Sequence, residues 1–128
     1  MEASGVITIT TDFGHKGPFA AVMKGVILSR FPDARIIDLA HDIPAQWPPE
    51  AGFWVSRSYP WFPAGTVHLA IVDPGVGTER DILLAACDGH LFMAPDNVVE
   101  EFPQFPAVFS YEDLKQEFIK ASNRSLVL

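Results

Sequence analysis

The sequence contains a single cysteine, Cys87, in a chain of 128 residues. One thiol cannot form an intramolecular disulfide, and this excludes the disulfide-stapled folds that are typical of small secreted proteins. Cys87 lies in the apolar stretch LLAACDGH. We therefore interpret it as a buried structural thiol, with a reactive thiol as the alternative.

Basic residues and long apolar runs are scarce as well. Nine lysines and arginines stand against sixteen acidic residues, which gives a formal net charge of −7. Phosphate backbones are bound mainly by Lys and Arg, so we expect no nucleic-acid partner. No apolar run approaches the roughly 20 residues of a membrane helix, and the start MEASGVITIT shows no cationic signal-peptide region. We expect a cytoplasmic protein without a membrane partner.

Apolar residues, by contrast, make up 48% of the chain, enough for the core of one domain. Strand patterns at 5–10, 34–39 and 66–72 alternate with a helix that begins at Pro18 and a shorter helix over 50–59. This alternation predicts an α/β fold with a mostly parallel open sheet flanked by helices.

The first predicted helix has apolar residues at helical spacing, which predicts one buried face. The residues of that face are Phe19, Val22, Met23, Val26 and Ile27. Further along, we predict a hairpin over 81–94 that turns at Asp88 and Gly89, a short strand over 107–111 and a helix over 112–121. Trp47, Trp54 and Trp61 are most simply core or interface residues, although Trp47 lies in a loop and is also a candidate for lining a pocket.

Three predicted strands end in polar residues: the first at Asp12, the second at Asp38 and His41, and the third at Asp73. The carboxyl ends of parallel strands share one edge of the sheet, and ligands of open α/β sheets bind there. Asp73 opens the segment DPGVGTER, whose glycines permit a close backbone approach to a ligand and whose Arg80 is a fixed cation. The alternative is a tight turn that an Asp–Arg ion pair closes.

The other candidate residues also have structural interpretations. Asp12 either binds ribose hydroxyls or forms a turn with its own backbone. His41 is a site candidate with a structural alternative, and we expect His68 to pack in the core. The four histidines of the sequence show no metal-ligand spacing, so we expect no zinc site.

Five segments occur in a characteristic order: ITTDFG, MKGVI, PDARIIDLAHDIPAQ, FPAGTVHLAIVDPGVGTER and DGHLFMAPDN. Together they closely resemble the N-terminal domain of the S-adenosylmethionine (SAM) hydroxide adenosyltransferases, or SAM hydrolases, relatives of the fluorinase and chlorinase. The resemblance covers about residues 6–100. It implies hydrolysis of SAM to adenosine and L-methionine by water or hydroxide attack at the ribose C5′. It also implies a substrate of the SAM or adenosine type, no cofactor, and a homo-oligomer that is a trimer in the family.

The resemblance further implies roles for single residues. Asp73 and Arg80 match the family's residues at the attacking water, and Asp12 matches the ribose-binding acid. Phe13, Gln46 and Asn97 fall in the substrate-binding set. A guanidinium beside the water favours its hydroxide form. The departing thioether is neutral, so the reaction needs neither an acid nor a metal at the leaving group.

The sequence departs from the family pattern in its last third. The family's HGRD-like segment, which carries a histidine of the site, and its C-terminal β domain have no counterpart here, and Val98 replaces the glycine after APDN. We expect a single α/β domain over 1–128 that is truncated relative to the family. Two main hypotheses stay open: a SAM hydrolase, intact or in need of its other domain, and a non-catalytic adenosine- or SAM-binding or oligomerisation module. A third hypothesis, an unrelated α/β hydrolase with Asp73 as nucleophile, lacks a recognisable general base in the sequence.

Overall fold

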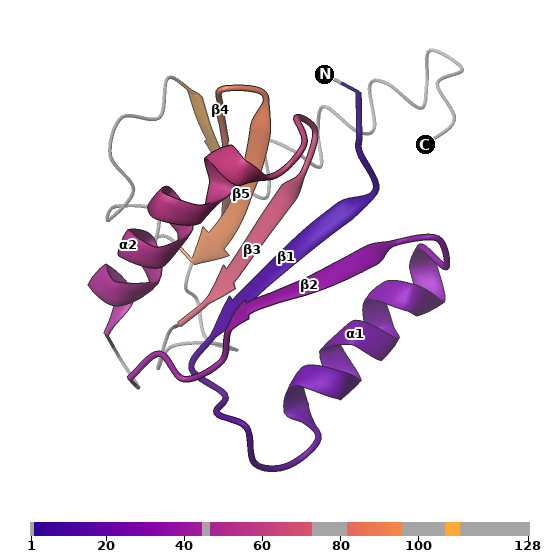
Figure 1. Cartoon of the computed structure of the whole chain (residues 1–128), viewed down its shortest axis with the longest axis vertical. Helices are drawn as coiled ribbons and strands as arrows, with labels where there is room; N and C mark the ends of the chain where they lie inside the picture. The colour runs from indigo at the N-terminus through magenta and orange to yellow at the C-terminus, as the bar shows by residue number, and fades with distance from the viewer. Residues whose placement is uncertain (1, 45–46, 73–81, 96–106, 111–128) are drawn as a thin grey trace.

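The computed structural model describes residues 2–44, 47–72 and 82–95, together with the backbone of 107–110. Strands and helices alternate from residue 6 to residue 71, as the sequence predicts (Figure 1). In chain order the elements are β1 (Val6–Thr11), α1 (Phe19–Arg30), β2 (Arg35–Ala40), α2 (Pro48–Ser58), the short 3-10 helix η1 (Tyr59–Trp61), β3 (Val67–Ile71), β4 (Ile82–Cys87), β5 (His90–Pro95) and β6 (Ala107–Ser110). The helix predicted over 112–121 lies outside the described residues.

The strands form one sheet in the order β2-β1-β3-β5-β4-β6. The pairs β1–β2, β1–β3 and β3–β5 are parallel, whereas β4 pairs antiparallel with both β5 and β6. The pair β4–β5 is a hairpin, which turns through Asp88 and Gly89, both at positive φ. The prediction of an α/β fold with a mostly parallel sheet is confirmed.

The hydrophobic core lies between α2 and the sheet, which α2 covers on one face (Figure 1). Alternate residues of β3 are buried, as expected for a strand with one face packed on a helix. Ala70 and Phe92 of the sheet pack with Ala51 and Val55 of α2. Burying one side chain of the size of Val55 or Phe92 contributes about 1.5–3 kcal/mol. This layer therefore fixes the parallel strands relative to α2.

Helix α1 departs from the sequence prediction. Its boundaries match, but Phe19, Val22 and Val26 are 63%, 60% and 63% exposed, and no residue of α1 is fully buried. The prediction that this face is buried is therefore wrong. Figure 1 shows α1 beside the edge strand β2, away from the centre of the sheet. Helical spacing defines an apolar stripe on α1, but it does not determine which neighbour covers that stripe.

The tryptophans also lie on the surface: Trp47 is 58%, Trp54 46% and Trp61 86% exposed. The core interpretation is therefore wrong for all three, and the interface interpretation stays a prediction. Trp47 directly precedes Pro48, the first residue of α2. Its candidate role in lining a pocket stays a prediction. Within the described part of the chain, no helix is both long and apolar enough to cross a membrane.

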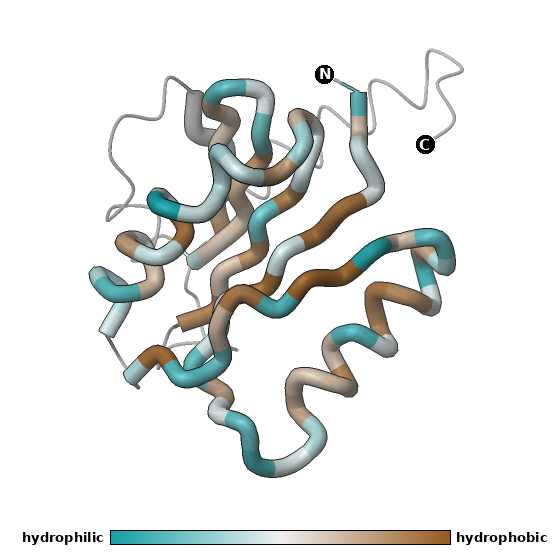
Figure 2. Tube along the Cα trace, viewed as in Figure 1, coloured by the Kyte–Doolittle hydropathy of each residue, from teal (hydrophilic) through white to brown (hydrophobic). Residues whose placement is uncertain are grey.

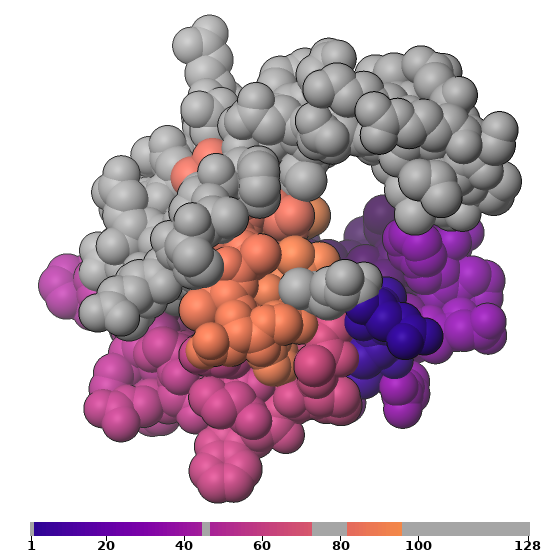
Figure 3. Space-filling model, turned by 90° about the horizontal axis from the view of Figure 1, so that it is seen from above, coloured from indigo at the N-terminus to yellow at the C-terminus, as the bar shows by residue number. Residues whose placement is uncertain are grey.

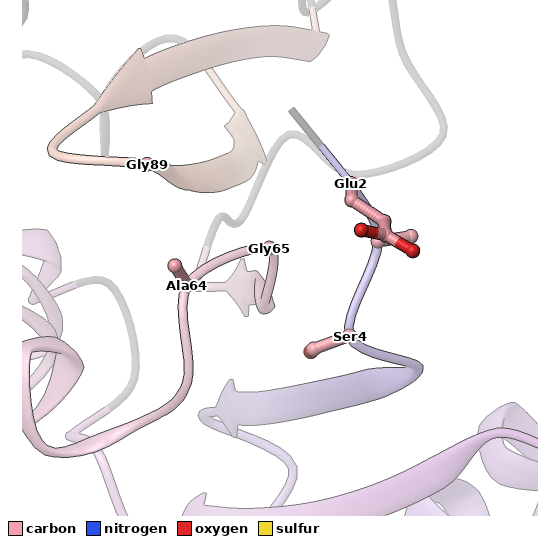
Figure 4. A pocket seen from close by; sticks show the side chains of 6 residues that line it. Glu2, Ser4, Ala64, Gly65 and Gly89 are labelled. Carbon is pink, nitrogen blue, oxygen red and sulfur yellow. The ribbon is translucent and has the colours of Figure 1, made fainter.

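The amino ends of the parallel strands form the edge opposite the predicted site. There the N-terminal segment, the turn before β3 and the β4–β5 hairpin lie next to one another (Figure 3). The Ser4 amide donates to the Gly65 carbonyl at 3.2 Å, and the Gly65 amide donates to the Gly89 carbonyl at 2.7 Å. A pocket at this edge is lined mainly by backbone and small side chains from these three segments (Figure 4). These contacts tie the amino edge together.

Candidate functional site

The loops after β1 and β2 meet at the carboxyl edge of the sheet. The Asp12 amide donates to the Ile71 carbonyl at 3.3 Å, which continues the β1–β3 pairing by one residue. The Gly14 amide donates to the His41 carbonyl at 2.6 Å. Figure 2 shows a hydrophilic segment in the turn between β1 and α1. The prediction that the first two strand ends share an edge is thus confirmed.

Two predicted substrate-binding residues, Asp12 and Phe13, lie in this turn, and both are half-buried. The ring of Phe13 lies 6.4 Å from the ring of Phe19, in a tilted arrangement. Gly14 follows with φ of +74°, a conformation that glycine adopts at little cost. The polypeptide therefore reverses direction sharply after β1, and Asp12 lies at the carboxyl edge of the sheet.

A hydrogen-bonded chain of side chains lies directly behind this turn. Lys24 Nζ donates to Asp38 Oδ2 at 2.6 Å, and Asp38 Oδ1 lies 2.6 Å from His41 Nε2. His41 Nδ1 lies 2.7 Å from Thr11 Oγ1, which also accepts the Phe13 amide at 3.2 Å. This series of hydrogen bonds runs from α1 through β2 to the end of β1. It brings together Asp38 and His41, as the sequence predicted.

The charges along this chain are complementary. The hydrogen bond from Lys24 lowers the pKa of Asp38, and the bond to His41 adds to this effect. Asp38 is half-exposed, whereas His41 is only 5% exposed and Thr11 is completely buried. An ionised Asp38 therefore serves as an acceptor between a lysine and a buried histidine. The structural interpretation of His41 therefore holds. Its hydrogen bonds to Asp38 and Thr11 stabilise the candidate site.

Other predicted site residues are not placed. Asp73, Arg80, Gln46 and Asn97 lie outside the described residues, so their roles stay predictions. Val72, the residue before Asp73, is completely buried and belongs to the core.

Sequence reasoning missed Thr11 and Lys24. Their partners in the chain are 30 and 14 residues away, so no local pattern marks them. The only signal is indirect: Thr11 ends the β-branched run of β1 and precedes Asp12, which places it at the strand end.

The remaining buried histidines form a separate cluster toward the amino edge. Thr8 Oγ1 lies 2.7 Å from His68 Nδ1, and His68 Nε2 lies 3.1 Å from His90 Nδ1. Burial lowers the pKa of His68 to about 4, and the neighbouring His90 adds to that shift. His68 is 1% exposed, which confirms its prediction as a core residue. Among the described residues, no group of three or more His, Cys, Asp or Glu side chains could hold a metal ion.

Cys87 is half-buried at the end of β4. Burial raises the pKa of its thiol, and the neighbouring Asp88 raises it further. A raised pKa disfavours the thiolate, which is the reactive form of cysteine. The thiol environment therefore favours the structural interpretation over the reactive one.

The comparison with known families settles the relationship of the chain. The model of the SAM hydroxide adenosyltransferase N-terminal domain matches residues 7–105. The chain belongs to the SAM hydroxide adenosyltransferase family. An (R)-S-adenosyl-L-methionine hydrolase of Thermus thermophilus is 41% identical over 87 residues, which are 68% of this chain and 34% of that protein. An uncharacterized conserved protein from Thermotoga maritima has a similar structure, with a TM-score of 0.72 and 33% identity over 81% of this chain and 41% of the other.

A shorter match points to a different kind of protein. The phosphoserine phosphatase ThrH of Pseudomonas aeruginosa is 66% identical over 50 residues, which are 39% of this chain and 24% of the phosphatase. Residues 1–6 and 106–128 are each shorter than that stretch, so it overlaps the part matched by the adenosyltransferase model. The chain spans about a third of the length of the hydrolase relatives.

Proposed function

We propose that this member of the SAM hydroxide adenosyltransferase family binds SAM at the carboxyl edge and takes part in its hydrolysis to adenosine and L-methionine. The observation that carries the proposal is the family match over residues 7–105. The Thermus relative, named as a SAM hydrolase, supports the choice of substrate. The turn at Asp12 supports the location, because it presents a carboxylate at the edge where open α/β sheets bind ligands.

The proposed reaction is an in-line displacement at the ribose C5′. The water oxygen forms a bond to C5′ while the bond between C5′ and the sulfonium breaks, and the electron pair leaves with the neutral thioether of methionine. The proton of the water departs to solvent or to a base. The site must hold the water in line and strip it of bulk solvent.

Three residues have proposed roles in this step. Asp12 accepts hydrogen bonds from the ribose hydroxyls and holds the sugar. Arg80 stabilises the hydroxide form of the nucleophile by its charge, and Asp73 orients the nucleophile. The proposed site is completed by three residues that border the substrate: Phe13, Gln46 and Asn97. No cofactor takes part, and the assembly we propose is a homo-oligomer whose neighbouring subunits complete the site.

The test is to incubate the purified chain with SAM and to measure adenosine and methionine by chromatography. We expect both products in equal amounts. Arg80→Ala should lower turnover more than affinity, because the guanidinium acts on the nucleophile. The matched control is Arg57→Ala, an exposed arginine on α2, which should leave turnover unchanged. Phosphate release from phosphoserine in a parallel assay, without adenosine from SAM, would contradict the proposal and favour a phosphatase.

Binding is measured separately from turnover. Calorimetric titration with adenosine should show binding that Asp12→Ala weakens by about 1–3 kcal/mol, the range for a hydrogen bond to a charged group. Asp33→Ala, which removes an exposed carboxylate from the opposite edge, should leave adenosine binding unchanged. Binding without turnover would favour the non-catalytic binding module. Unchanged affinity of Asp12→Ala would remove Asp12 from the site.

A further inference from the structure

We propose that Thr11, His41 and Asp38 are positioning residues that hold the Asp12–Phe13 turn in the conformation that receives the ribose. The involvement of ribose rests on the proposed function. We call the hydrogen-bonded set of Thr11, His41 and Asp38 the clamp. The evidence for the clamp is the contacts of the described residues alone. The two parts can therefore be tested separately.

The backbone of the turn is fixed at three consecutive positions. Each backbone N–H group of residues 12–14 donates to a different neighbour. The acceptors, in order, are the Ile71 carbonyl at 3.3 Å, the Thr11 hydroxyl at 3.2 Å and the His41 carbonyl at 2.6 Å. His41 thus acts twice, directly through its carbonyl and indirectly through its ring on Thr11. Fixing a residue costs about 1–2 kcal/mol of conformational entropy, which a turn held before binding does not lose again on binding.

The hydrogen bonds of the clamp run in one direction. The Phe13 N–H can only donate, so Thr11 Oγ1 accepts there and has one hydrogen left to donate. The ionised carboxylate of Asp38 can only accept, so His41 Nε2 must carry a hydrogen. In the neutral imidazole that carries its hydrogen on Nε2, Nδ1 accepts the hydrogen of the Thr11 hydroxyl. A neutral imidazole with its hydrogen on Nε2 satisfies every partner, and Asp38 selects that tautomer.

The same three residues have the connectivity of a nucleophilic triad, with an acid, a histidine and a hydroxyl in sequence. Burial excludes that role. Thr11 is completely buried, and its oxygen is already occupied by the Phe13 amide. A nucleophile must reach its substrate, whereas this hydroxyl bonds to the buried His41 ring and to the backbone of the turn. The arrangement therefore serves to position the turn.

Lys24 extends the clamp to helix α1. Its ammonium bonds to the second oxygen of Asp38 at 2.6 Å, which leaves the first oxygen for His41. Since α1 has no fully buried residue, this ion pair is a specific link between the helix and the sheet. Lys24 thereby orients the carboxylate that selects the tautomer of His41.

The test compares two isosteric substitutions in the same strand. Thr11→Val removes the hydroxyl of the clamp, and Thr8→Val removes a hydroxyl that bonds to His68 at the same distance of 2.7 Å. Both threonines are completely buried, so each variant loses a buried threonine–histidine hydrogen bond, and Thr11→Val also loses the bond from the Phe13 amide. The two variants differ in which edge of the sheet they affect.

Calorimetry with adenosine and with SAM gives the first measurement on the whole chain. Thr11→Val should weaken both affinities about three- to tenfold, which corresponds to the loss of one hydrogen bond. Thr11→Ser, which keeps the hydroxyl, should restore affinity to within about twofold, and Thr8→Val should leave it unchanged. Equal effects of Thr8→Val and Thr11→Val, or no effect of either, would overturn the positioning role.

Nuclear magnetic resonance gives a second measurement that needs no ligand. The ring nitrogens of His41 should show hydrogen on Nε2 and none on Nδ1, and the Phe13 amide should exchange with solvent slowly. Thr11→Val should speed that exchange, whereas Thr8→Val should not. The opposite tautomer, or unchanged exchange in Thr11→Val, would refute the clamp. If the wild-type chain shows the clamp but binds neither ligand, the proposed function fails and the clamp stands.

Discussion

At the scale of single residues, strand β1 carries two threonine–histidine pairs with different consequences. Thr8 bonds to His68 within the core, and Thr11 bonds to His41 at the carboxyl edge. Residues 8 and 11 point to opposite faces of the sheet because side chains alternate along a strand. The first pair satisfies buried polar groups in the core. The second also fixes the turn that carries Asp12.

The buried His68 should make stability depend on pH. Burial lowers its pKa from 6.5 to about 4, so the unfolded chain takes up a proton at a higher pH than the folded chain does. The contribution is complete above pH 6.5 and is lost as the pH falls toward 4. The full loss corresponds to roughly 3 kcal/mol. His90, whose pKa burial also lowers, faces His68 and adds to the trend.

The measurement is denaturant unfolding of the wild type and of His68→Gln at several pH values between 4 and 7. Glutamine does not titrate and can still bond to Thr8. The free energy of unfolding of the variant should fall less steeply with decreasing pH than that of the wild type. Parallel curves would show that His68 does not titrate between the two states.

Sequence reasoning reached some of the residues of the candidate site but not others. Asp12 and His41 were identifiable because they are polar side chains at the carboxyl ends of parallel strands, where open α/β sheets bind ligands. Thr11 and Lys24 were not, because their importance comes from partners that only folding brings close. The pairing of Asp38 with His41 was partly predictable, since both lie at the carboxyl end of the same strand.

At the scale of elements, the sequence predicted strands better than the environment of helices. β1, β2 and β3 lie within a residue or two of their predicted ranges, because β-branched runs and turn residues are local signals. The exposure of Val22 and Val26 on α1 was not predictable, because an apolar stripe says nothing about its cover. The β4–β5 hairpin was predictable from its Asp-Gly turn.

The turn before β3 provides a test at this scale. Gly65 has φ of +86°, and a Cβ atom there would overlap the carbonyl oxygen of Glu2. Gly65→Ala should therefore destabilise the chain by at least about 2 kcal/mol, through backbone strain and displacement of the N-terminal segment. The measurement is the free energy of unfolding in denaturant.

The matched control is Gly25→Ala, within α1, where a Cβ meets no atom. Alanine favours helix over glycine, so this variant should gain roughly 0.5–1 kcal/mol. If Gly65→Ala were as stable as the wild type, the close packing of the amino edge would be contradicted.

At the scale of the whole molecule, the two edges of the sheet differ in character. The amino edge is closed by backbone hydrogen bonds among the N-terminal segment, the turn at Gly65 and the hairpin at Gly89. The carboxyl edge carries Asp12 and the side-chain clamp behind it. The parallel direction of β1, β2 and β3 was predictable from the alternation of strands and helices, and it places the clamp and the turn together.

The most direct test of this account is to map SAM onto the chain by following backbone amide resonances during a titration. The account predicts the largest shifts at Asp12, Phe13 and Gly14, with the amides of Ser4 and Gly65 unchanged. This result would place SAM at the carboxyl edge whether or not hydrolysis follows. Shifts concentrated at the amino edge, or none at saturating SAM, would contradict the central claim.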